Sequence, residues 1–336
     1  MIEIQPVVPV SLALAFFCVG LAGGAAQAET PRFAFPVDCK IGETCFIQNY
    51  FDLDPGTARL DPGCGRLSYE GHDGTDIRAL DIPAMRLGVT VRAAAEGVVK
   101  ATRDEMADVS IRETGAAAVV GREAGNGVVI DHGQGWETQY SHLALNSIVV
   151  VPGDSVKAGA PLGRIGLSGQ TEFPHVHFTV RKNGVPLDPF TGATAWSCGD
   201  PTTSLWSEAA LRDLGYIPTG PLIAGFAATA PDPETIRSGQ GRLGEVASDP
   251  ASLVFWADIF GVQAGDMQTI LILGPDGAEW FRQVDALAAN NVSWFAFGGR
   301  RKPAGGWTPG PYTGRYLLER DGEVLIDRAG TIDIIK

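Results

Sequence analysis

The chain has 336 residues, of which 45% are apolar and 19% are charged, so it is long enough for two globular domains and too apolar for a disordered chain. It carries 26 Lys and Arg against 39 Asp and Glu, a formal charge of −13, which argues against nucleic acid as the main partner because an acidic surface repels phosphate. Its 43 glycines and 22 prolines favour short strands and turns over long helices.

The first segment, residues 1–28, is predicted to be a signal peptide. A largely apolar run without charged side chains extends from Val7 to Ala26, and Ala26-Gln27-Ala28 has the small-x-small pattern of a signal-peptidase site. The run is also long enough to span a membrane, so an uncleaved anchor is the alternative. We therefore expect an exported protein, periplasmic or secreted, whose mature chain begins near Glu29.

Four cysteines remain after this segment: Cys39, Cys45, Cys64 and Cys198. An even number in an oxidising compartment predicts two disulfides, which three connectivities would allow. In one of them, Cys39–Cys45 closes a short local loop and Cys64–Cys198 joins the two ends of the central region. A zinc knuckle is the rival interpretation, and the lack of a C-x-x-C pair argues against it.

Residues 29–70 are rich in turn-forming residues and are predicted to form an irregular N-terminal wrap. The next region, residues 71–216, is predicted to be an antiparallel β domain with an Ala-rich surface insertion at 102–125. Ser207 before an acidic first turn indicates a short helix over 207–214. The strands expected in this region include 97–99, 128–130 and 147–151.

A Pro- and Gly-rich passage, residues 217–235, is predicted to be a linker. Short apolar runs in residues 236–336 then predict a small C-terminal β-sandwich, and Asp321-Gly322 is a strong hairpin signal between two of its strands. No group of residues there indicates chemistry, although a cell-envelope protein could bind to this domain. The strands expected are 253–256, 269–273, 294–297, 316–320 and 323–326.

Four of the five histidines lie with one aspartate in three short segments. In the first segment, His72 and Asp76 stand four residues apart, and the glycine between them favours a loop that enters a strand. The second segment contributes His142, just after a tyrosine and a serine. In the third, His175 and His177 stand two apart, so on a strand they share one face.

Two histidines and one carboxylate are a set that zinc uses when its fourth position stays open for water. We expect the ligands to be His72, Asp76 and one histidine of the His175/His177 pair. Zinc lowers the pKa of water to near 7 and polarises a carbonyl oxygen, so the remaining histidines would be free to move protons. His132 lies in a predicted hairpin turn and is expected to be structural.

The order of three motifs resembles that of the lysostaphin-type (M23) zinc metallopeptidases. These are H-x-G-x-D from His72, H-G-x-G-x-x-T-x-Y-x-H-L ending at Leu143, and G-x-S-G-x-T-x-x-P-H-x-H-F ending at Phe178, and the resemblance covers residues 66–190. It implies an M23-type β-sheet fold with one Zn²⁺ per chain. The residues that match the family's zinc ligands are His72, Asp76 and His177.

The resemblance also implies how the water would be activated. His142 and His175 match the two histidines that orient and deprotonate the attacking water. The family's transition-state tyrosine precedes the first histidine, and Tyr69 is the tyrosine nearest to that place. Phe173 stands where a glycine is common and Val176 where a leucine is usual, which leaves the ligands intact and affects the expected shape of the substrate site.

Family members of this type cut peptide cross-links of bacterial peptidoglycan, so the resemblance implies a zinc endopeptidase with a peptidoglycan peptide as substrate. The main alternative is a non-catalytic member that binds peptidoglycan or activates an amidase. Such members usually lack one or more ligands, and no ligand is missing here. A lipoyl- or biotinyl-type carrier is a third alternative, but a carrier needs a lysine at a hairpin tip and no histidine cluster.

Overall fold

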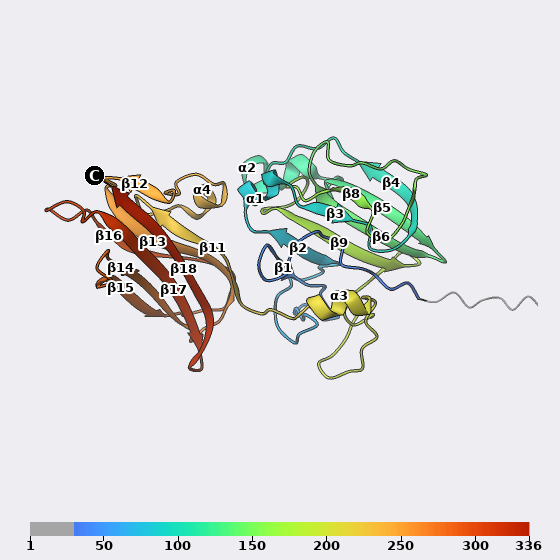
Figure 1. The fold of residues 1–336 in the computed structure, drawn as a ribbon. Coiled ribbons are helices and arrows are strands. Elements are labelled where there is room, and N and C mark those ends of the chain that lie inside the picture. Colours follow the sequence, from blue (N-terminus) through green and yellow to red (C-terminus); the bar gives the residue numbers. More distant parts are fainter. Residues whose placement is uncertain (1–29, 336) are drawn as a thin grey trace, which may run out of the picture. The chain divides into compact units, whose positions relative to one another are not determined.

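The computed structural model describes residues 30–335, so the predicted signal peptide lies outside the described residues (Figure 1). Strands dominate the described part of the chain, and nearly all of their pairings are antiparallel, which confirms the mainly β prediction. Within residues 30–335, no helix combines the length and the apolar character that crossing a membrane requires.

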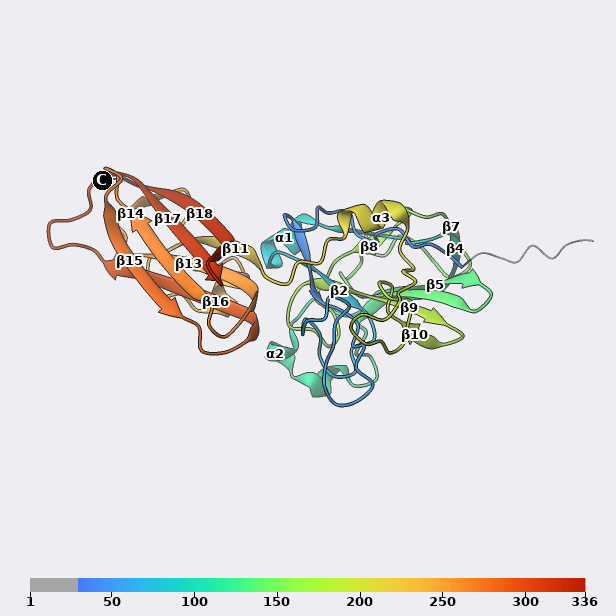
Figure 2. The ribbon, with the colours of Figure 1, turned by 90° about the horizontal axis from the view of Figure 1, so that it is seen from below.

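An eight-stranded sheet occupies the N-terminal region, in the order β1-β2-β9-β6-β5-β4-β7 with β10 added to β9. Its central strands lie side by side in Figures 1 and 2. A separate two-stranded sheet is made by β3 (Thr90–Arg92) and β8 (Pro161–Arg164). The eight strands are β1 (Cys45–Asn49), β2 (Thr75–Ala79), β4 (Gly97–Arg103), β5 (Asn126–Gly133), β6 (Trp136–Leu143), β7 (Ser155–Val156), β9 (His175–Lys182) and β10 (Val185–Leu187).

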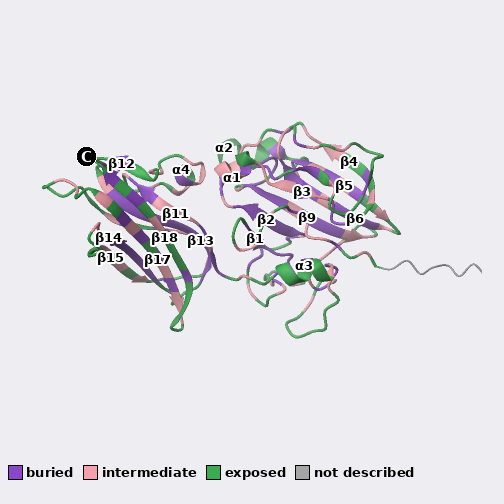
Figure 3. Ribbon diagram, in the orientation of Figure 1, coloured by how far each residue is buried: buried purple, intermediate pink, exposed green. Residues whose placement is uncertain are grey.

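Alternation along β9 decides what each face of this sheet carries. Val176, Phe178 and Val180 are fully buried in the apolar core, and they alternate with the residues of the opposite face. His175 and His177 therefore lie together on the face that turns away from this core. Figure 3 shows buried residues alternating with less buried ones along the central strands.

Two predictions for this region are wrong. The N-terminal wrap is not wholly irregular, because β1 lies inside it and pairs with β2 at the edge of the sheet. Residues 147–151 form no strand. The Asp104 carboxylate accepts hydrogen bonds from the backbone N–H groups of Asn146 (2.7 Å) and Ile148 (3.0 Å), so a side chain takes donors that a neighbouring strand would have used.

The helices of this region are short. Helix α1 (Ile82–Leu87) was not predicted, although Asp81 caps it by accepting from the Ala84 N–H at 2.7 Å and a proline occupies its first turn. The predicted insertion holds α2 (Ile111–Thr114) and the 3₁₀ turn η1 (Ala116–Val119). Helix α3 (Glu208–Asp213) follows Ser207, whose hydroxyl accepts from the Ala210 N–H, and confirms the helix expected there.

The C-terminal region has a three-stranded sheet, β11-β13-β16, and a five-stranded sheet, β12-β18-β17-β14-β15. One apolar cluster contains residues of both sheets, among them Phe255, Ile259, Tyr316 and Ile332, as a β-sandwich requires. The strands are β11 (Gly220–Ala227), β12 (Val246–Ser248), β13 (Ser252–Val262), β14 (Met267–Leu273), β15 (Glu279–Ala286), β16 (Asn291–Arg301), β17 (Gly310–Arg320) and β18 (Glu323–Ile335).

The predicted linker is wrong for much of its length, because β11 pairs with β13 along its whole span and the short helix α4 (Pro233–Arg237) follows. The glycines that suggested a linker make room for aromatic rings instead. A Cβ on Gly220 would lie 2.9 Å from the Phe260 ring, and one on Gly225 would lie 3.0 Å from the Trp256 ring. The hairpin at Asp321-Gly322 is confirmed, with φ of 51° and 83°.

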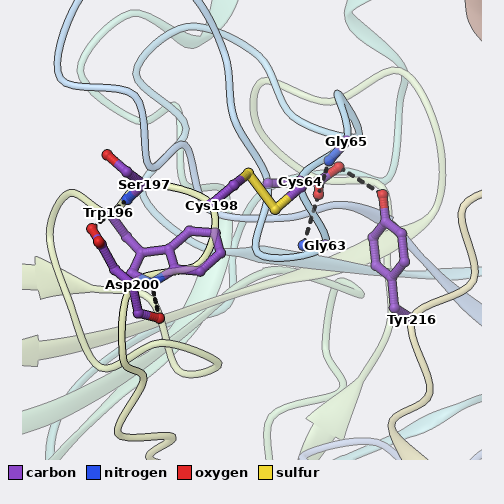
Figure 4. The surroundings of a disulfide bond; sticks show 9 residues. Gly63, Cys64, Gly65, Trp196, Ser197, Cys198, Asp200 and Tyr216 are labelled. Atoms are coloured by element: carbon purple, nitrogen blue, oxygen red, sulfur yellow. Dashed lines mark hydrogen bonds between the residues drawn. A yellow bond between two sulfur atoms is a disulfide. The ribbon is translucent and has the colours of Figure 1, made fainter.

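The structure contains two disulfides, Cys39–Cys45 and Cys64–Cys198, as expected for an exported chain. Figure 4 shows the second one, with Tyr216 on the side of Cys64. The Asp61 carboxylate accepts from the N–H groups on both sides of Cys64 and from the Tyr216 hydroxyl at 3.0 Å. These bonds fix the loop that leads to the first histidine motif.

Candidate metal centre

Strand register brings together the side chains that could bind a metal ion. Asp76 of β2 lies directly opposite His177 of β9, and His177 lies opposite Ser141 of β6. On the other side of β2, Asn49 of β1 lies opposite Asp76. These four residues therefore form a row across four strands, and His72 stands in the turn that precedes β2.

Three atoms of this row and turn lie close enough to share one cation. His72 Nε2 is 3.1 Å from both Asp76 Oδ1 and His177 Nδ1, and the last two atoms are 2.9 Å apart. Ligands of a tetrahedral zinc ion, at about 2.0–2.2 Å from the metal, lie roughly 3.3 Å from one another. The set of two imidazole nitrogens and one carboxylate oxygen therefore fits zinc with shifts of a few tenths of an ångström.

Two of the three groups are held in place through their other polar atoms. His72 Nδ1 donates to the Tyr50 carbonyl oxygen at 2.6 Å, which leaves Nε2 toward the centre of the site. Asn49 Nδ2 donates to Asp76 Oδ2 at 2.9 Å, which leaves Oδ1. Such partners fix the orientations of the His72 ring and the Asp76 carboxylate, so their remaining donor atoms point toward a common centre.

Neighbouring charges also shift the pKa values of two candidate ligands, Asp76 and His177. Burial opposes ionisation of Asp76, but His72 and His175 outweigh it and hold the carboxyl pKa well below its usual range. Burial by itself would lower the pKa of His177, but hydrogen bonds with Asp73 and Asp76 raise it to about 9. Asp76 is therefore a buried carboxylate at neutral pH, with imidazoles as its neighbours.

Two further histidines lie beside the three. His142 Nδ1 is 2.8 Å from the Ser168 carbonyl oxygen, so the ring donates there. His175 Nδ1 is 2.9 Å from the Phe173 carbonyl oxygen and 3.0 Å from the Thr171 hydroxyl. The two ring centres are 4.7 Å apart. In both rings Nδ1 is engaged, so Nε2 is the nitrogen that faces the site, and in His175 it lies 3.3 Å from Asp76 Oδ1.

The environment of His142 favours its neutral form. Burial, followed by the positive charge that His175 and His177 can carry, lowers the pKa of His142 well below 6.5. Its backbone has a φ of 61°, a left-handed conformation that is uncommon outside glycine. A neutral imidazole held in this way is suited to act as a base at neutral pH.

Tyr69 stands at the rim of the site. Its ring centre is 4.4 Å from that of His72, and its side chain remains about half exposed. Partial burial, together with the charges of Asp76 and Asp73, raises the pKa of the Tyr69 hydroxyl. The group therefore stays protonated and can donate a hydrogen bond.

His132 lies apart from this group, in β5. Its Nδ1 is 2.6 Å from the Glu96 carbonyl oxygen and its Nε2 is 2.8 Å from the Thr138 hydroxyl, so both nitrogens are used within the sheet. The structural role expected for it agrees with these contacts. The structure thus brings six sequence-predicted residues together, namely Tyr69, His72, Asp76, His142, His175 and His177.

Sequence reasoning missed the residues that support the site. Asn49 lies in a region predicted to be irregular, and no pattern in the sequence connects it with Asp76. Ser168 and Thr171 are inside the third motif, so their fixed spacing from the histidines was an available signal. Asp73 directly follows His72, and an aspartate in a turn gives no signal in the sequence of its contact with His177.

Comparison with known proteins agrees with this geometry. A model of peptidase family M23 matches residues 70–189. The peptidoglycan DD-endopeptidase ShyA of Vibrio cholerae is 32% identical over 157 residues, which are 46% of this chain and 28% of ShyA. The DD-carboxypeptidase/endopeptidase Mpg of Neisseria meningitidis is 32% identical over 108 residues, 32% of this chain and 20% of Mpg.

Among solved structures, a zinc-containing peptidase from Vibrio cholerae has 27% sequence identity and a TM-score of 0.28, covering 44% of this chain and 39% of that one. This chain spans less than a third of the length of the two curated relatives named above. The matched residues include His72, Asp76 and His177, and also His142 and His175. Residues 70–189 therefore carry a domain that matches the model of peptidase family M23.

Proposed function

We propose that this protein is a zinc-dependent endopeptidase that cuts peptide cross-links of bacterial peptidoglycan. The observation that carries the proposal is the cluster of His72, Asp76 and His177 donor atoms within 3.1 Å of one another, beside two histidines whose Nδ1 atoms are engaged. The names of the relatives ShyA and Mpg support the substrate class.

In this proposal His72, Asp76 and His177 hold one zinc ion per chain. When bound, zinc supplies Lewis-acid polarisation of the scissile carbonyl and a lowered pKa for the attacking water. Asp76 brings the negative charge that a dication needs in a buried place, since it is only 2% exposed. Asn49 and the Tyr50 carbonyl keep two of the three ligand groups in the required orientation.

The chain's own residues then move protons. His142 accepts one proton of the attacking water at Nε2 and returns it to the leaving amine, while His175 orients the water, so that both rings end the cycle as they began it. The Tyr69 hydroxyl donates to the carbonyl oxygen as that atom gains negative charge. The backbone carbonyl groups that accept from Nδ1 of His142 and His175 keep both imidazoles protonated at Nδ1, which leaves Nε2 of each ring to contact the water.

The location and organisation of the chain are part of the same proposal. Two disulfides support export to the periplasm or beyond. We propose two domains, with the peptidase domain ending near residue 216 and the C-terminal domain beginning at β11 rather than at residue 236. The C-terminal sheets are a candidate surface for a cell-envelope protein.

Purified protein incubated with peptidoglycan sacculi tests the activity, with mass analysis of the released muropeptides. We expect cross-linked fragments to fall and uncross-linked fragments to rise, and chelation of the metal to stop the reaction. His132→Gln is the matched histidine control and should remain active, because His132 lies outside the site. A protein that holds zinc and cleaves no peptidoglycan preparation would instead be a binding or amidase-activating member.

A further inference from the structure

One carboxylate next to the site has no role in the function proposed above. Asp73 follows His72 in the turn before β2, and its side chain is 48% exposed. Asp73 Oδ1 lies 3.1 Å from His177 Nε2, while the other nitrogen of the same ring lies 2.9 Å from Asp76 Oδ1. The His177 ring is therefore placed between a buried carboxylate at the metal centre and an outer carboxylate at the rim.

The outer carboxylate is itself held by side chains of the same sheet face. Arg181 Nη2 is 3.8 Å from Asp73 Oδ2, and Arg181 Nη1 donates to Gln139 Oε1 at 2.8 Å. Gln139 Nε2 in turn donates to the Ser141 hydroxyl at 2.8 Å. Polar contacts thus connect Gln139 of β6 and Arg181 of β9 to Asp73, which contacts His177.

The space around the ring restricts its orientation. A Cβ at Gly74 would lie 2.6 Å from His177 Nε2 and 2.8 Å from the Phe178 carbonyl oxygen. The missing side chain at this position lets the ring approach the backbone of the turn and reach Asp73. The close fit leaves His177 few alternatives to the observed rotamer.

An imidazole that binds a metal through Nδ1 carries its proton on Nε2, so the partner of Nε2 decides the tautomer. A carboxylate is the strongest neutral-pH acceptor for that proton, because its hydrogen bond is charge-assisted. Outer partners of this kind also raise the basicity of the ligand, and their loss typically weakens metal binding by about 10–100-fold.

We propose that Asp73 is a positioning residue that accepts the His177 Nε2–H hydrogen bond and directs Nδ1 toward the zinc, with Arg181 holding the Asp73 carboxylate in place. The inference rests on the proposed zinc site. The H-x-G-x-D pattern leaves the residue after His72 unspecified, so this contact is separate from the pattern that identified the family.

Zinc affinity of the full chain tests the proposal, measured by competition with a chromophoric chelator. Asp73→Ala should bind zinc about 10–100-fold more weakly than the wild type, and Asp73→Asn should show a smaller loss because its side-chain oxygen can still accept. Asp327→Asn is the matched control, since Asp327 is also about half exposed and paired with an arginine, and its zinc affinity should not change.

A spectroscopic measurement separates positioning from stability. In zinc-loaded wild type, the Nε2 proton of His177 should be visible by ¹H–¹⁵N NMR because its hydrogen bond slows exchange with water. It should broaden or vanish in Asp73→Ala and be weakened in Arg181→Gln, while Asp73→Asn, being isosteric, retains the fold. A structural role alone would lower the thermal stability and leave this signal in place.

The outcomes distinguish this inference from the function on which it rests. Equal zinc affinity in Asp73→Ala and the wild type would overturn the positioning role and leave the peptidase proposal intact. A wild type that binds zinc and shows the Asp73 effect, yet cleaves no peptidoglycan, would support the inference and refute the proposed activity. A wild type that binds no zinc would refute both.

Discussion

Two buried aspartates, one in each sheet region, show how differently the regions use charge. Asp258 of β13 is fully buried and receives two hydrogen bonds of 2.7 Å from the Arg237 guanidinium. Asp76 of β2 is 2% exposed, and within residues 30–335 its ion-pair partners are the histidines His72, His175 and His177. Asp258 is thus paired with a guanidinium that is charged at every physiological pH, whereas Asp76 is surrounded by imidazoles, which can bind a metal ion.

A second buried aspartate of the C-terminal sheets repeats the pattern of Asp258. Asp266 of the C-terminal sheets, only 1% exposed, is again bound by a guanidinium, that of Arg320 at 2.7 and 2.8 Å. No histidine or cysteine occurs after Cys198, so imidazole and thiol chemistry is confined to the N-terminal region. Asp76 differs from these two aspartates, because histidines take the place of the guanidinium as its ion-pair partners.

The largest expected effect comes from removing each of these carboxylates. Asp76→Ala should reduce bound zinc from one per chain to near zero and bring peptidoglycan cleavage to background, because a charged ligand is lost from a three-ligand site. Asp258→Ala should keep its zinc but lose about 3–5 kcal/mol of stability, because the buried Arg237 charge is left unpaired. Metal analysis of both variants measures the zinc content, and urea unfolding measures the stability. Full zinc occupancy in Asp76→Ala would show that Asp76 is not a ligand.

Within the N-terminal region, the comparison can be sharpened by separating proton transfer from metal binding. His142→Ala should retain its zinc and its thermal stability while turnover falls by about 10²–10⁴-fold, the range for loss of a general base. His177→Ala should instead lose zinc and activity together. Zinc stoichiometry and cleavage rates are measured on both variants, and a His142→Ala protein that stays active or loses its zinc contradicts the role assigned to His142.

Substitution of two glycines, one in each region, should perturb the zinc site and the C-terminal core less than the loss of a carboxylate does. A Cβ on Gly74 would lie 2.6 Å from His177 Nε2, and a Cβ on Gly314 of β17 would lie 2.0 Å from the Phe255 ring. Each Ala substitution should cost about 1–3 kcal/mol through overpacking, but only Gly74→Ala should also weaken zinc binding, by roughly tenfold. Unfolding curves and zinc titration decide this, and unchanged zinc affinity in Gly74→Ala would show that His177 has room to move.

The smallest expected effect, on stability alone, concerns Asp188, a buried carboxylate that is paired with neither a guanidinium group nor a histidine in the described part of the chain. Asp188 Oδ2 accepts from the N–H and hydroxyl of Thr191 at 2.8 Å each, while Oδ1 is buried without a hydrogen bond. Burial raises the pKa of Asp188 from 3.8 to about 6. The folded chain thus keeps a proton that the unfolded chain releases, so stability from this group is complete below pH 3.8 and is lost as the pH rises through about 6.

Asp188→Asn should therefore stabilise the protein at pH 7.5 by up to about 3 kcal/mol, at about 1.4 kcal/mol per pH unit of the pKa difference. The gain should nearly vanish at pH 4, where the carboxyl of the folded chain is protonated and that of the unfolded chain, with a pKa of 3.8, is already partly protonated. Urea unfolding at the two pH values tests the sign. Asp258→Asn should show the opposite behaviour and destabilise at pH 7.5, because Arg237 loses its anionic partner.

Local patterns in the sequence predicted a large part of the molecule. Short apolar runs predicted β13, β14 and β16, and Asp321-Gly322 predicted the last hairpin, because both signals depend on neighbouring residues. The three histidine segments, taken with their spacing, were sufficient to select His72 and Asp76 as candidate ligands. The resemblance to a family then favoured His177 over His175.

Only the tertiary structure decided how these segments meet. The pairing of β1 with β2 brought Asn49 opposite Asp76, and the pairing of β2 with β9 brought Asp76 opposite His177, although the partners are far apart in the chain. A slip of one residue in either pairing would turn these side chains to the core face. Composition and local spacing carry no information on such register, because it is set by how whole strands bury their apolar faces against one another.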